Sequence, residues 1–370
     1  MKIKSIKSIA ITIPLKHGIK MGGILYTESE NLLVRVKSED GSVGWGEAPA
    51  APTMTGETIA SMEAAITYLT PHLINQNVTS FEKNMHLMDQ FLYGNSSAKA
   101  ALEISFCDVV GKIEKKSMSE LLGGSKRNKI PVLWMLAAGK LNADSEEARM
   151  KLDEGFKSFK VKVGGNSIQD DINRVKTVRK IIGNTLQLSA DANQAWKCTE
   201  AIKFVEGASD SLDFIEQPIM GNDLEGMKKI ARASSAPLGA DEGLHSISDI
   251  ILHKEKGAAA GGSLKTIKLG GVMKAFEAAE LCNQINMKVN LAGKICETSV
   301  ASAAVSHLAA SIPQIDWGLS ITNQYAAQDI AREPVGISDG NVNVPNGYGL
   351  GVEIDEAALE NLAKGSISDD

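Results

Sequence analysis

The sequence predicts an α/β protein, a TIM-like barrel preceded by a smaller α+β module. Eight short apolar runs alternate with helical patterns over residues 126–326, strands precede helices before residue 125, and the 34 glycines suit a fold with many tight turns. Because strands that alternate with helices form parallel βαβ units, eight of them closing on each other make a barrel. A doubly wound open sheet is the alternative. No G-x-G-x-x-G motif follows a strand, which argues against its dinucleotide-binding form.

The first module is expected over residues 1–125. Residues 2–13 alternate polar and apolar side chains as a strand does, and two apolar runs flank a turn at residues 38–41, which is a hairpin signal. Between the first strand and the hairpin, residues 14–30 are rich in glycine and polar side chains, and we expect a functional loop there. The hairpin strands are placed at 31–37 and 42–47, helices at 57–73, 80–92 and 97–115, and a short helical turn at 119–122.

The barrel is expected over residues 126–326. Its strands are placed at 130–137, 159–163, 186–190, 212–215, 237–240, 264–267, 288–292 and 315–319. Its helices are placed at 145–154, 169–182, 199–207, 224–233, 246–255, 271–284 and 299–310. The tail, residues 327–370, contains a Gly-, Pro- and Asn-rich stretch and a final short helix, and we expect it to return to the first module.

Composition excludes several classes of protein. The chain has 370 residues and a formal charge of −6, the wrong sign for binding a nucleic-acid backbone. No apolar run approaches the ~20 residues of a membrane span, and residues 1–13 are typical of a strand rather than a signal peptide. The four cysteines form no C-x-x-C pair and the six histidines have no metal spacing, so we expect neither a disulfide framework nor a zinc site. A cytoplasmic enzyme without membrane or nucleic-acid partners fits these features.

Charged side chains follow successive barrel strands at regular intervals. Lys162, Asp191, Glu216, Asp241 and Lys265 lie 24 to 29 residues apart, the length of one βα unit. Active sites of this fold lie at the C-terminal ends of the strands, so the three carboxylates on neighbouring strands are expected to converge. Crowded carboxylates repel one another unless a cation lies between them, and oxygen ligands without Cys or His suit a hard divalent ion. The sequence therefore predicts a Mg²⁺ site, which Mn²⁺ can also fill.

The two lysines predict the chemistry. The second and sixth strands of an eight-stranded ring face each other, so Lys162 and Lys265 would flank a ligand from opposite sides. Removal of a weakly acidic α-proton from a carboxylic acid needs a base and a cation that holds the enediolate charge. A lysine acts as a base only when it is neutral, and its ordinary pKa is about 10.4. Lys160, on the same strand face as Lys162, would lower that pKa together with the metal ion and burial.

Each of these features has a structural interpretation when it is taken alone. A K-x-K pair is typical of a solvated strand. Asp191 alone could belong to an Asx turn, and the pair Asp241-Glu242 could lie at the N-terminus of a helix. Five such residues in one register are not explained by packing, so the functional interpretation is favoured. Lys268 is the exception, because a supporting or solvent-facing role is expected for it.

The motifs around these residues resemble the enolase superfamily, in its muconate-lactonizing-enzyme subgroup, over essentially the whole chain. They are GWGEAP (44–49), SAKAALEISFCDVVGK (97–112), FKVKVG (159–164), DANQAW (191–196), FIEQP (214–218), ADE (240–242), LKTIKLGG (264–271) and CETS (296–299). The resemblance implies a (β/α)7β barrel under a capping domain built from both chain ends. It implies metal ligands at Asp191, Glu216 and Asp241, acid/base lysines at Lys162 and Lys265, and a capping loop at 14–30 that closes over substrate.

Sequence differences from related subgroups narrow the range of expected substrates. Residues 290–297 contain no histidine, unlike the mandelate-racemase subgroup at its seventh strand. Dipeptide epimerases resemble the chain closely, but Leu319-Ser320-Ile321 replaces their Asp-x-Asp motif, and their capping-loop arginine is missing near Ile24. An Ala-Glu type of dipeptide is therefore not favoured.

The leading prediction is a Mg²⁺-dependent racemase or epimerase of an amino-acid derivative or dipeptide-like acid. A muconate-type cycloisomerase, or a β-elimination dehydratase or synthase on the same site, is the alternative. A Schiff-base aldolase and a non-catalytic barrel are remote alternatives. Asn193, Glu242 and Glu297 are expected to contact the substrate or support the site, and residues 317–325 to help set specificity together with the loop. The partner is a small-molecule carboxylate, and the resemblance implies a homo-oligomer.

Overall fold

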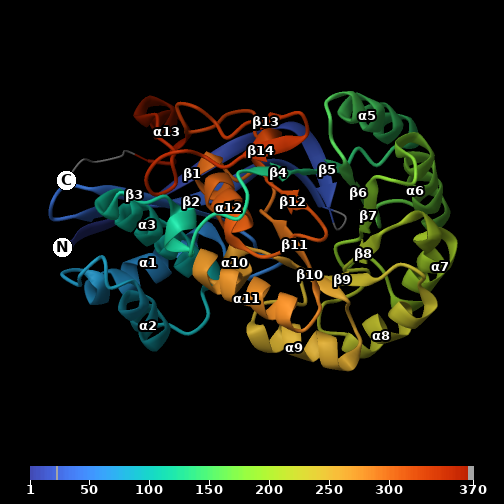
Figure 1. Cartoon of the computed structure of the whole chain (residues 1–370), viewed down its shortest axis with the longest axis horizontal. Coiled ribbons are helices and arrows are strands. Elements are labelled where there is room, and N and C mark those ends of the chain that lie inside the picture. Colours follow the sequence, from blue (N-terminus) through green and yellow to red (C-terminus); the bar gives the residue numbers. More distant parts are fainter. Residues whose placement is uncertain (22–23, 366–370) are drawn as a thin grey trace.

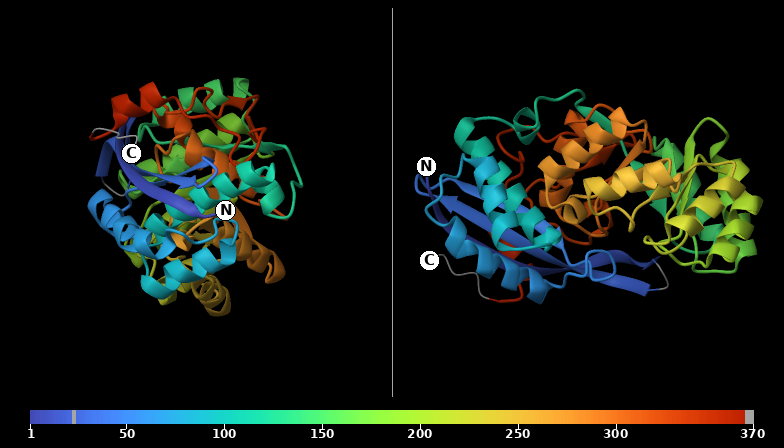
Figure 2. Two further views of the ribbon diagram at one scale, coloured as in Figure 1. Left: turned by 90° about the vertical axis from the view of Figure 1, so that its left-hand side faces the viewer. Right: turned by 90° about the horizontal axis from the view of Figure 1, so that it is seen from below.

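The computed structural model describes residues 1–21 and 24–365 and has the predicted α/β architecture (Figures 1 and 2). Eight parallel strands follow one another in chain order around a nearly closed ring, with helices on its outside. A bridge between Val132 and Leu319 joins its two ends. The ring strands are β5 (Leu133–Leu136), β6 (Ser158–Lys162), β7 (Gln187–Asp191), β8 (Phe214–Glu216), β9 (Leu238–Ala240), β10 (Gly261–Leu264), β11 (Lys288–Ala292) and β12 (Leu319–Ser320).

The barrel helices follow the predicted alternation. They are α5 (Leu141–Asp153), α6 (Ile168–Ile182), α7 (Cys198–Ala208), α8 (Leu224–Ala233), α9 (Ile247–Lys256), α10 (Thr266–Leu269), α11 (Val272–Gln284) and α12 (Ser299–Ser311), with the 3₁₀ turns η1 (Ser209–Ser211) and η2 (Asn323–Tyr325). No helix in the described ranges is both long enough and apolar enough to cross a membrane. The four cysteines, all in these ranges, are free thiols.

Three predicted strands are placed differently in the structure. The run 130–137 divides into a strand outside the barrel, β4 (Lys129–Pro131), and β5 inside it. The sixth strand lies at Gly261–Leu264 rather than 264–267. Glycine is required at its start, because a Cβ on Gly261 would come within 2.6 Å of the Trp317 ring. Trp317 stacks on Phe214 inside the barrel, with ring centroids 4.3 Å apart, and the eighth strand begins after it.

The first module is an antiparallel sheet of β1 (Ile3–Met21), β2 (Ile24–Ser38) and β3 (Val43–Pro49). Its helices are α1 (Ile59–Leu73), α2 (Phe81–Phe91), α3 (Ser96–Glu114) and α4 (Met118–Leu121). Glycine is required at Gly46 because β3 lies against α3, where an added Cβ would come within 1.9 Å of the Ala101 carbonyl oxygen.

The expectation of a loop at 14–30 is wrong. Strands β1 and β2 pair as far as Met21 and Ile24, with a register shift between Pro14 and Ile19, and residues 22 and 23 lie outside the described part. The apolar alternation resumes after the polar interruption at residues 16–18, and this continuity is the signal that the sequence interpretation missed. Figure 2 shows the long hairpin running from the first module along the barrel.

A buried carboxylate joins the first module to the barrel. Glu47 of β3 accepts hydrogen bonds from the Asn31 side chain at 2.6 Å, from the Thr298 N–H and hydroxyl at 2.8 and 2.6 Å, and from the Ala301 N–H at 3.0 Å. The carboxylate thus satisfies free N–H groups at the start of α12. The two modules are held in register at the helix that follows the seventh barrel strand.

The C-terminal segment contacts both modules. Its strands β13 (Ile337–Ser338) and β14 (Asn341–Asn343) form a small sheet with β4, and α13 (Glu356–Leu362) follows them. The Lys364 N–H donates to the Ala10 carbonyl oxygen at 2.9 Å, which places the tail against β1.

His307 makes the stability of the fold sensitive to acid. It is fully buried in α12, its Nε2 lies 3.1 Å from the Leu350 carbonyl oxygen, and burial lowers its pKa from 6.5 to about 4. The unfolded chain therefore binds one more proton than the folded chain between these two pH values, and stability falls as the pH drops through this window. We expect His307→Gln to flatten the slope of unfolding free energy against pH by up to about 1.4 kcal/mol per unit.

Chemical denaturation between pH 7 and pH 4 measures that slope. His86→Gln, on the exposed side of α2, is the matched control and should leave the slope unchanged. Equal slopes for His307→Gln and the unsubstituted protein would contradict the assignment.

Candidate active site

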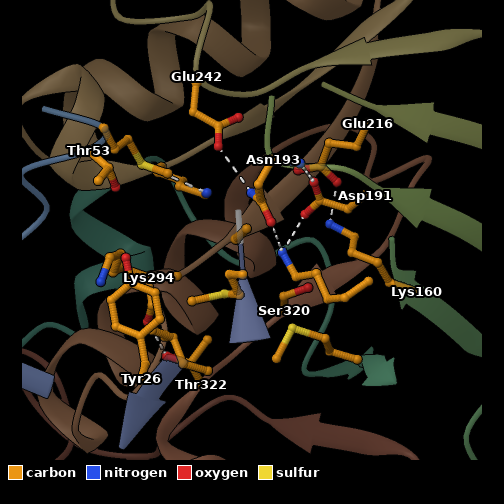
Figure 3. A pocket seen from close by; sticks show the side chains of 18 of the residues that line it. Tyr26, Thr53, Lys160, Asp191, Asn193, Glu216, Glu242, Lys294, Ser320 and Thr322 are labelled. Atoms are coloured by element: carbon orange, nitrogen blue, oxygen red, sulfur yellow. Dashed lines mark hydrogen bonds and ion pairs between the residues drawn. The ribbon is translucent and has the colours of Figure 1, made fainter. Parts of the chain in front are cut away.

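A cavity of about 290 Å³ opens at the C-terminal ends of the barrel strands (Figure 3). One part of its wall carries charged side chains from the strand ends, and another part carries Met21, Ile24 and Tyr26 from the end of the β1–β2 hairpin. Thr53 and Met54, from the loop after β3, complete the wall. The volume is close to that of pockets that enclose small molecules. The hairpin therefore reaches the position where a substrate-covering element was expected.

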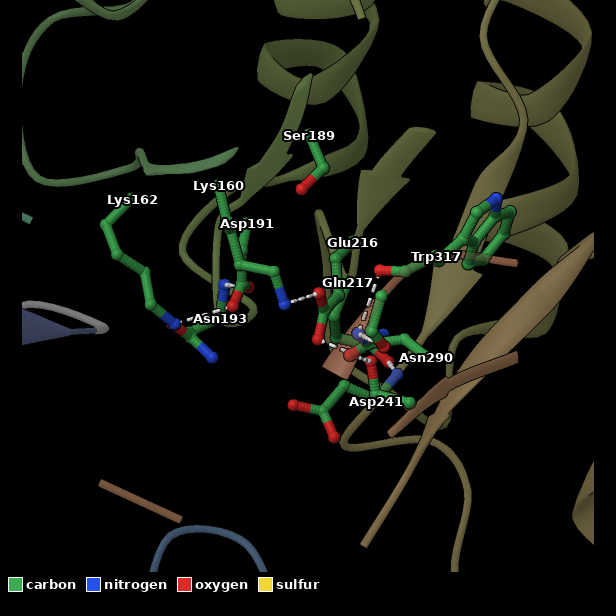
Figure 4. A network of polar contacts seen from close by, with 12 residues as sticks. Lys160, Lys162, Ser189, Asp191, Asn193, Glu216, Gln217, Asp241, Asn290 and Trp317 are labelled. Atoms are coloured by element: carbon green, nitrogen blue, oxygen red, sulfur yellow. Dashed lines mark hydrogen bonds and ion pairs between the residues drawn. The ribbon is translucent and has the colours of Figure 1, made fainter. Parts of the chain in front are cut away.

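The three predicted carboxylates lie together on neighbouring strands. Asp191 ends β7 and pairs in register with Glu216, which ends β8, while Asp241 directly follows β9 (Figure 4). All three residues are buried, with exposed fractions of 2% or less. Burial, and then the repulsion of the other two carboxylates, raises the pKa of Glu216. Such a buried acidic cluster needs positive charge nearby.

Lysine ammonium groups neutralise the cluster. Lys160 Nζ contacts Glu216 Oε2, and Lys162 Nζ donates to Asp191 Oδ2 at 2.6 Å. Asp241 receives two lysines, because Lys265 Nζ and Lys268 Nζ each lie 2.6 Å from one of its oxygens. Each carboxylate of the cluster thus has a cationic partner from another strand or loop.

Lys162 and Lys265 reach the cavity from opposite sides. Lys162 is the last residue of β6, Lys265 follows β10, and these two strands lie four apart in the ring of eight. Both side chains line the cavity, and a ligand held at the carboxylates would lie between them. The predicted convergence of the lysines and the carboxylates is therefore found, although β10 ends one residue before Lys265.

The pKa values of two lysines beside the carboxylates are raised. Burial lowers the pKa of Lys265, but the attraction of Asp241 and other carboxylates outweighs it and raises the pKa above the ordinary value. The same balance, with Glu216 as the main partner, raises the pKa of Lys160. Without further positive charge at the carboxylates, Lys265 is a protonated acid rather than a base.

Asn193 and Glu242 link the two sides of the site. Asn193 accepts a hydrogen bond from Lys162 Nζ at 2.7 Å and donates to Glu242 Oε1 at 3.0 Å (Figure 3). Burial and the nearby Asp241 raise the pKa of Glu242 to about 7. Asn193 has a left-handed backbone with φ of 44°, an uncommon conformation that is often found at functional sites.

Glu297, expected to contact the substrate or to support the site, does not line the cavity. Its Oε1 accepts the Lys294 N–H at 2.9 Å, and its own N–H donates to Thr322 Oγ1 at 3.1 Å. The carboxyl group therefore organises the loop after β11 from behind the wall. Sequence position placed Glu297 after a strand but could not show which way its side chain points.

Several site residues were not predicted. Gln217 accepts hydrogen bonds from the Asp241 and Gly243 N–H groups at 2.8 and 3.1 Å, and Ser263 Oγ lies 2.7 Å from Glu216 Oε1. Lys268, expected to support the site or face solvent, is 1% exposed and supports Asp241. Lys294 lines the cavity without belonging to any regular spacing. The left-handed backbone of Gln217, with φ of 35°, has no clear signal in the sequence.

The donor chemistry of the cluster fits a hard divalent cation. Asp191, Glu216 and Asp241 offer only carboxylate oxygens, the ligands that Mg²⁺ and Mn²⁺ prefer. In the structure, however, the oxygens of these carboxylates contact lysine ammonium groups. Within residues 1–21 and 24–365, no group of three or more His, Cys, Asp or Glu side chains is arranged to hold a metal ion. Cation binding would therefore require these carboxylates to reorient away from their lysine partners.

Comparisons with known proteins cover nearly the whole chain. Residues 8–123 match the family model described as "Mandelate racemase / muconate lactonizing enzyme, N-terminal domain", and residues 143–358 match "Enolase C-terminal domain-like". An N-succinyl-L-Arg/Lys racemase of Bacillus cereus is 31% identical, with 98% of each chain covered. An L-Ala-D/L-Glu epimerase of Bacillus subtilis is 29% identical over 95% of this chain and 97% of its own.

The solved structures agree with this result. The crystal structure of muconate lactonizing enzyme from Pseudomonas fluorescens, complexed with muconolactone, has a TM-score of 0.94 and 28% sequence identity. The match covers 98% of this chain and 99% of that one. Both modules, and not only the barrel, are therefore shared with these proteins.

Proposed function

We propose that this protein abstracts the α-proton of a small carboxylate substrate. The chain belongs to the mandelate racemase / muconate lactonizing enzyme family of the enolase superfamily, and it is an isomerase of that superfamily. The observation that carries the proposal is the placement of Lys162 and Lys265 on opposite sides of one cavity, next to three carboxylates. A pair of bases on opposite faces suits a reaction that inverts a stereocentre.

The lysines exchange acid and base roles. One removes the α-proton from one face of the substrate, and the other delivers a proton to the opposite face, so the configuration at the α-carbon is inverted. Lys162 is held by Asp191 and Asn193, and Lys265 by Asp241, which fixes both ammonium groups at the cavity wall. Lys160 lies beside the cluster, where it tunes Lys162 and attracts the substrate carboxylate.

Asp191, Glu216 and Asp241 would hold a Mg²⁺ ion, or Mn²⁺ in its place. When bound, such an ion supplies the positive charge that stabilises an enediolate and makes a neutral lysine accessible. The support for this is the donor chemistry of the cluster and the family resemblance. Asn193 and Glu242 connect Lys162 to the other side of the site and keep its ammonium group oriented.

A racemase or epimerase of an amino-acid derivative or dipeptide-like acid is the favoured activity. Two relatives, with 31% and 29% identity, are named for such reactions. Cycloisomerisation is the second candidate, because the muconate lactonizing enzyme structure has a TM-score of 0.94. A β-elimination would use the same two lysines. These reactions share one step, the transfer of a proton between a lysine and the carbon beside a carboxylate, with an enediolate on one side of that step.

Deuterium exchange tests the shared step. The protein is incubated with Mg²⁺ in D₂O with a panel of N-acyl amino acids, dipeptides, amino acids and sugar acids, and loss of the α-proton signal is followed by NMR. We expect exchange with one class of compound and inversion of configuration for that class. Absence of exchange across the panel, together with turnover of a muconate-type dicarboxylate, would favour the cycloisomerase. Covalent trapping by borohydride would instead indicate a Schiff-base enzyme.

A further inference from the structure

One lysine of the cavity has no acidic partner. Lys294, in the loop after β11, is 9% exposed and lines the cavity with Tyr26, whose ring centroid lies 5.2 Å from its Nζ. The other cavity-lining lysines in the described part of the chain, Lys160, Lys162 and Lys265, each contact a carboxylate, whereas no ion pair is found there for Lys294. A buried ammonium group without a counter-charge is costly unless a ligand supplies one.

The neighbouring acid does not fill this role. Glu297 turns Oε1 to the backbone N–H of Lys294 rather than to its ammonium group. Burial, and then the repulsion of Lys265, lowers the pKa of Lys294 to about 8, although Glu297 opposes the shift. The direction of the shift agrees with the geometry, since both describe an ammonium group that lacks a negative partner.

Lys294 lies across the barrel mouth from Asp191 and Glu216. The cluster is carried by β7, β8 and β9, and β11 lies four, three and two strands from them in the ring of eight. Figure 3 shows Lys294 and Tyr26 on one side of the cavity and Asp191 and Glu216 on the other. A molecule whose reacting end lies at the cluster therefore has its far end beside Lys294.

The residues that line the cavity at and after the ends of β11 and β12 include no acid. Ser320 and Thr322, at the end of β12, line it with hydroxyl groups, and Ile295 adds an apolar side chain. The segment Leu319-Ser320-Ile321 is likewise uncharged. A cationic group at the far end of a ligand would meet an ammonium group and no carboxylate, so it would be repelled.

We propose that Lys294 binds an anionic group at the distal end of the substrate, so that the cavity selects dianionic molecules, carboxylic acids with a second carboxylate on the side away from the reacting carbon. The assignment of the reacting end rests on the proposed function, whereas the anion site rests on the environment of Lys294. Tyr26 from the hairpin covers this end and thereby couples the first module to recognition of the second carboxylate.

Three glycine derivatives with the same four-carbon acyl chain probe the site. N-succinylglycine ends in a carboxylate, N-butyrylglycine in a methyl group, and N-(4-aminobutyryl)glycine in an ammonium group. Titration calorimetry of the full chain with Mg²⁺ should give binding in the order succinyl, butyryl, aminobutyryl. We expect the succinyl compound to bind about tenfold more tightly than the butyryl compound, as for a hydrogen bond to a charged group.

Variants separate the charge of Lys294 from its packing. Lys294→Met should bind the succinyl and butyryl compounds equally, and Lys294→Arg should keep most of the preference. Lys16→Met is the matched control, because it removes a lysine of the β1–β2 hairpin that does not line this cavity. The Nζ of Lys16 donates to the Gln324 carbonyl oxygen, and the variant should keep the full preference for the succinyl compound. Thermal melting of each variant confirms that it is folded.

The outcomes for the two proposals are distinguishable. An unchanged preference in Lys294→Met, no preference in the unsubstituted protein, or no binding of any of the three compounds would overturn the anion site. The α-protons of N-succinylglycine are followed by NMR in D₂O in the same samples. A preference that Lys294→Met removes, without any exchange, would support the anion site and contradict the proposed chemistry.

Discussion

Lys162→Ala and Lys265→Ala should each reduce interconversion of the two substrate configurations by about 10³-fold or more, in the range expected for loss of a general acid or base. Each variant should nevertheless still exchange the α-proton of one configuration, and the two variants should retain opposite ones. The reason is geometric, because the two lysines approach the cavity from β6 and from the end of β10, on opposite sides of the ring. Removing one lysine leaves the other able to remove and return a proton on its own face.

The measurement is ¹H NMR in D₂O with each separate configuration of the compound that the exchange panel identifies. Racemisation is read by chiral chromatography of the same samples. Lys288→Ala, which removes an exposed lysine paired with Asp316 at the start of β11, is the matched control and should retain both activities. One variant could lose exchange with both configurations while the other variant keeps exchange with both. This result would indicate a single base and would favour cycloisomerisation or elimination.

The positions of the clustered carboxylates and lysines were the part of the site most accessible to sequence reasoning. Asp191, Glu216 and Asp241 each follow a strand whose apolar run is clear, and a repeat of about one βα unit brings such positions to one end of a barrel. Lys265 was placed correctly at this end, although the sixth strand was predicted at 264–267 and lies at Gly261–Leu264. The strand itself was missed because Gly261 and Gly262 lack the β-branched side chains that predict strands.

The remainder of the site depends on side-chain direction, which spacing does not encode. Glu297 and Lys294 lie three residues apart in one loop, yet Lys294 lines the cavity and Glu297 lies behind the wall. The sequence interpretation named Glu297 and not Lys294, because both are charged residues after the seventh strand and spacing does not tell which of them faces the cavity. Gln217 was overlooked because its role depends on a left-handed backbone conformation that the sequence does not signal. In that conformation its side chain accepts a hydrogen bond from the Asp241 N–H.

The hairpin illustrates a different limit. Residues 14–30 were assigned to a loop from their glycine and polar content, and the structure extends the strands on both sides instead. Cross-strand pairing with β2 stabilises this segment, and pairing partners distant in sequence are invisible to local composition. The functional part of the expectation, that the segment lies over the site, agrees with Met21, Ile24 and Tyr26 at the cavity wall.

Removal of divalent cations is the second large effect expected. Treatment with EDTA followed by desalting should reduce turnover by about 10³-fold or more, and Mg²⁺ or Mn²⁺ should restore it, because the negative charge of an enediolate would otherwise be uncompensated. A second measurement does not depend on activity. A cation that binds only the folded chain stabilises it by about 2.7 kcal/mol at a concentration 100 times its dissociation constant, so Mg²⁺ should raise the melting temperature.

Variants of the cluster test whether the effect arises there. Asp191→Asn and Glu216→Gln should lose the Mg²⁺-dependent rise in melting temperature, whereas Asp249→Asn, at the N-terminus of α9, should keep it. The comparison is made within each variant with and without Mg²⁺, because Glu216→Gln also leaves Lys160 without its buried partner and lowers the baseline stability. Full turnover after verified metal removal, or a Mg²⁺ effect of equal size in Asp191→Asn, would exclude the cluster as the cation site. The lysines would then remain the counter-ions of the three carboxylates, as the structure has them.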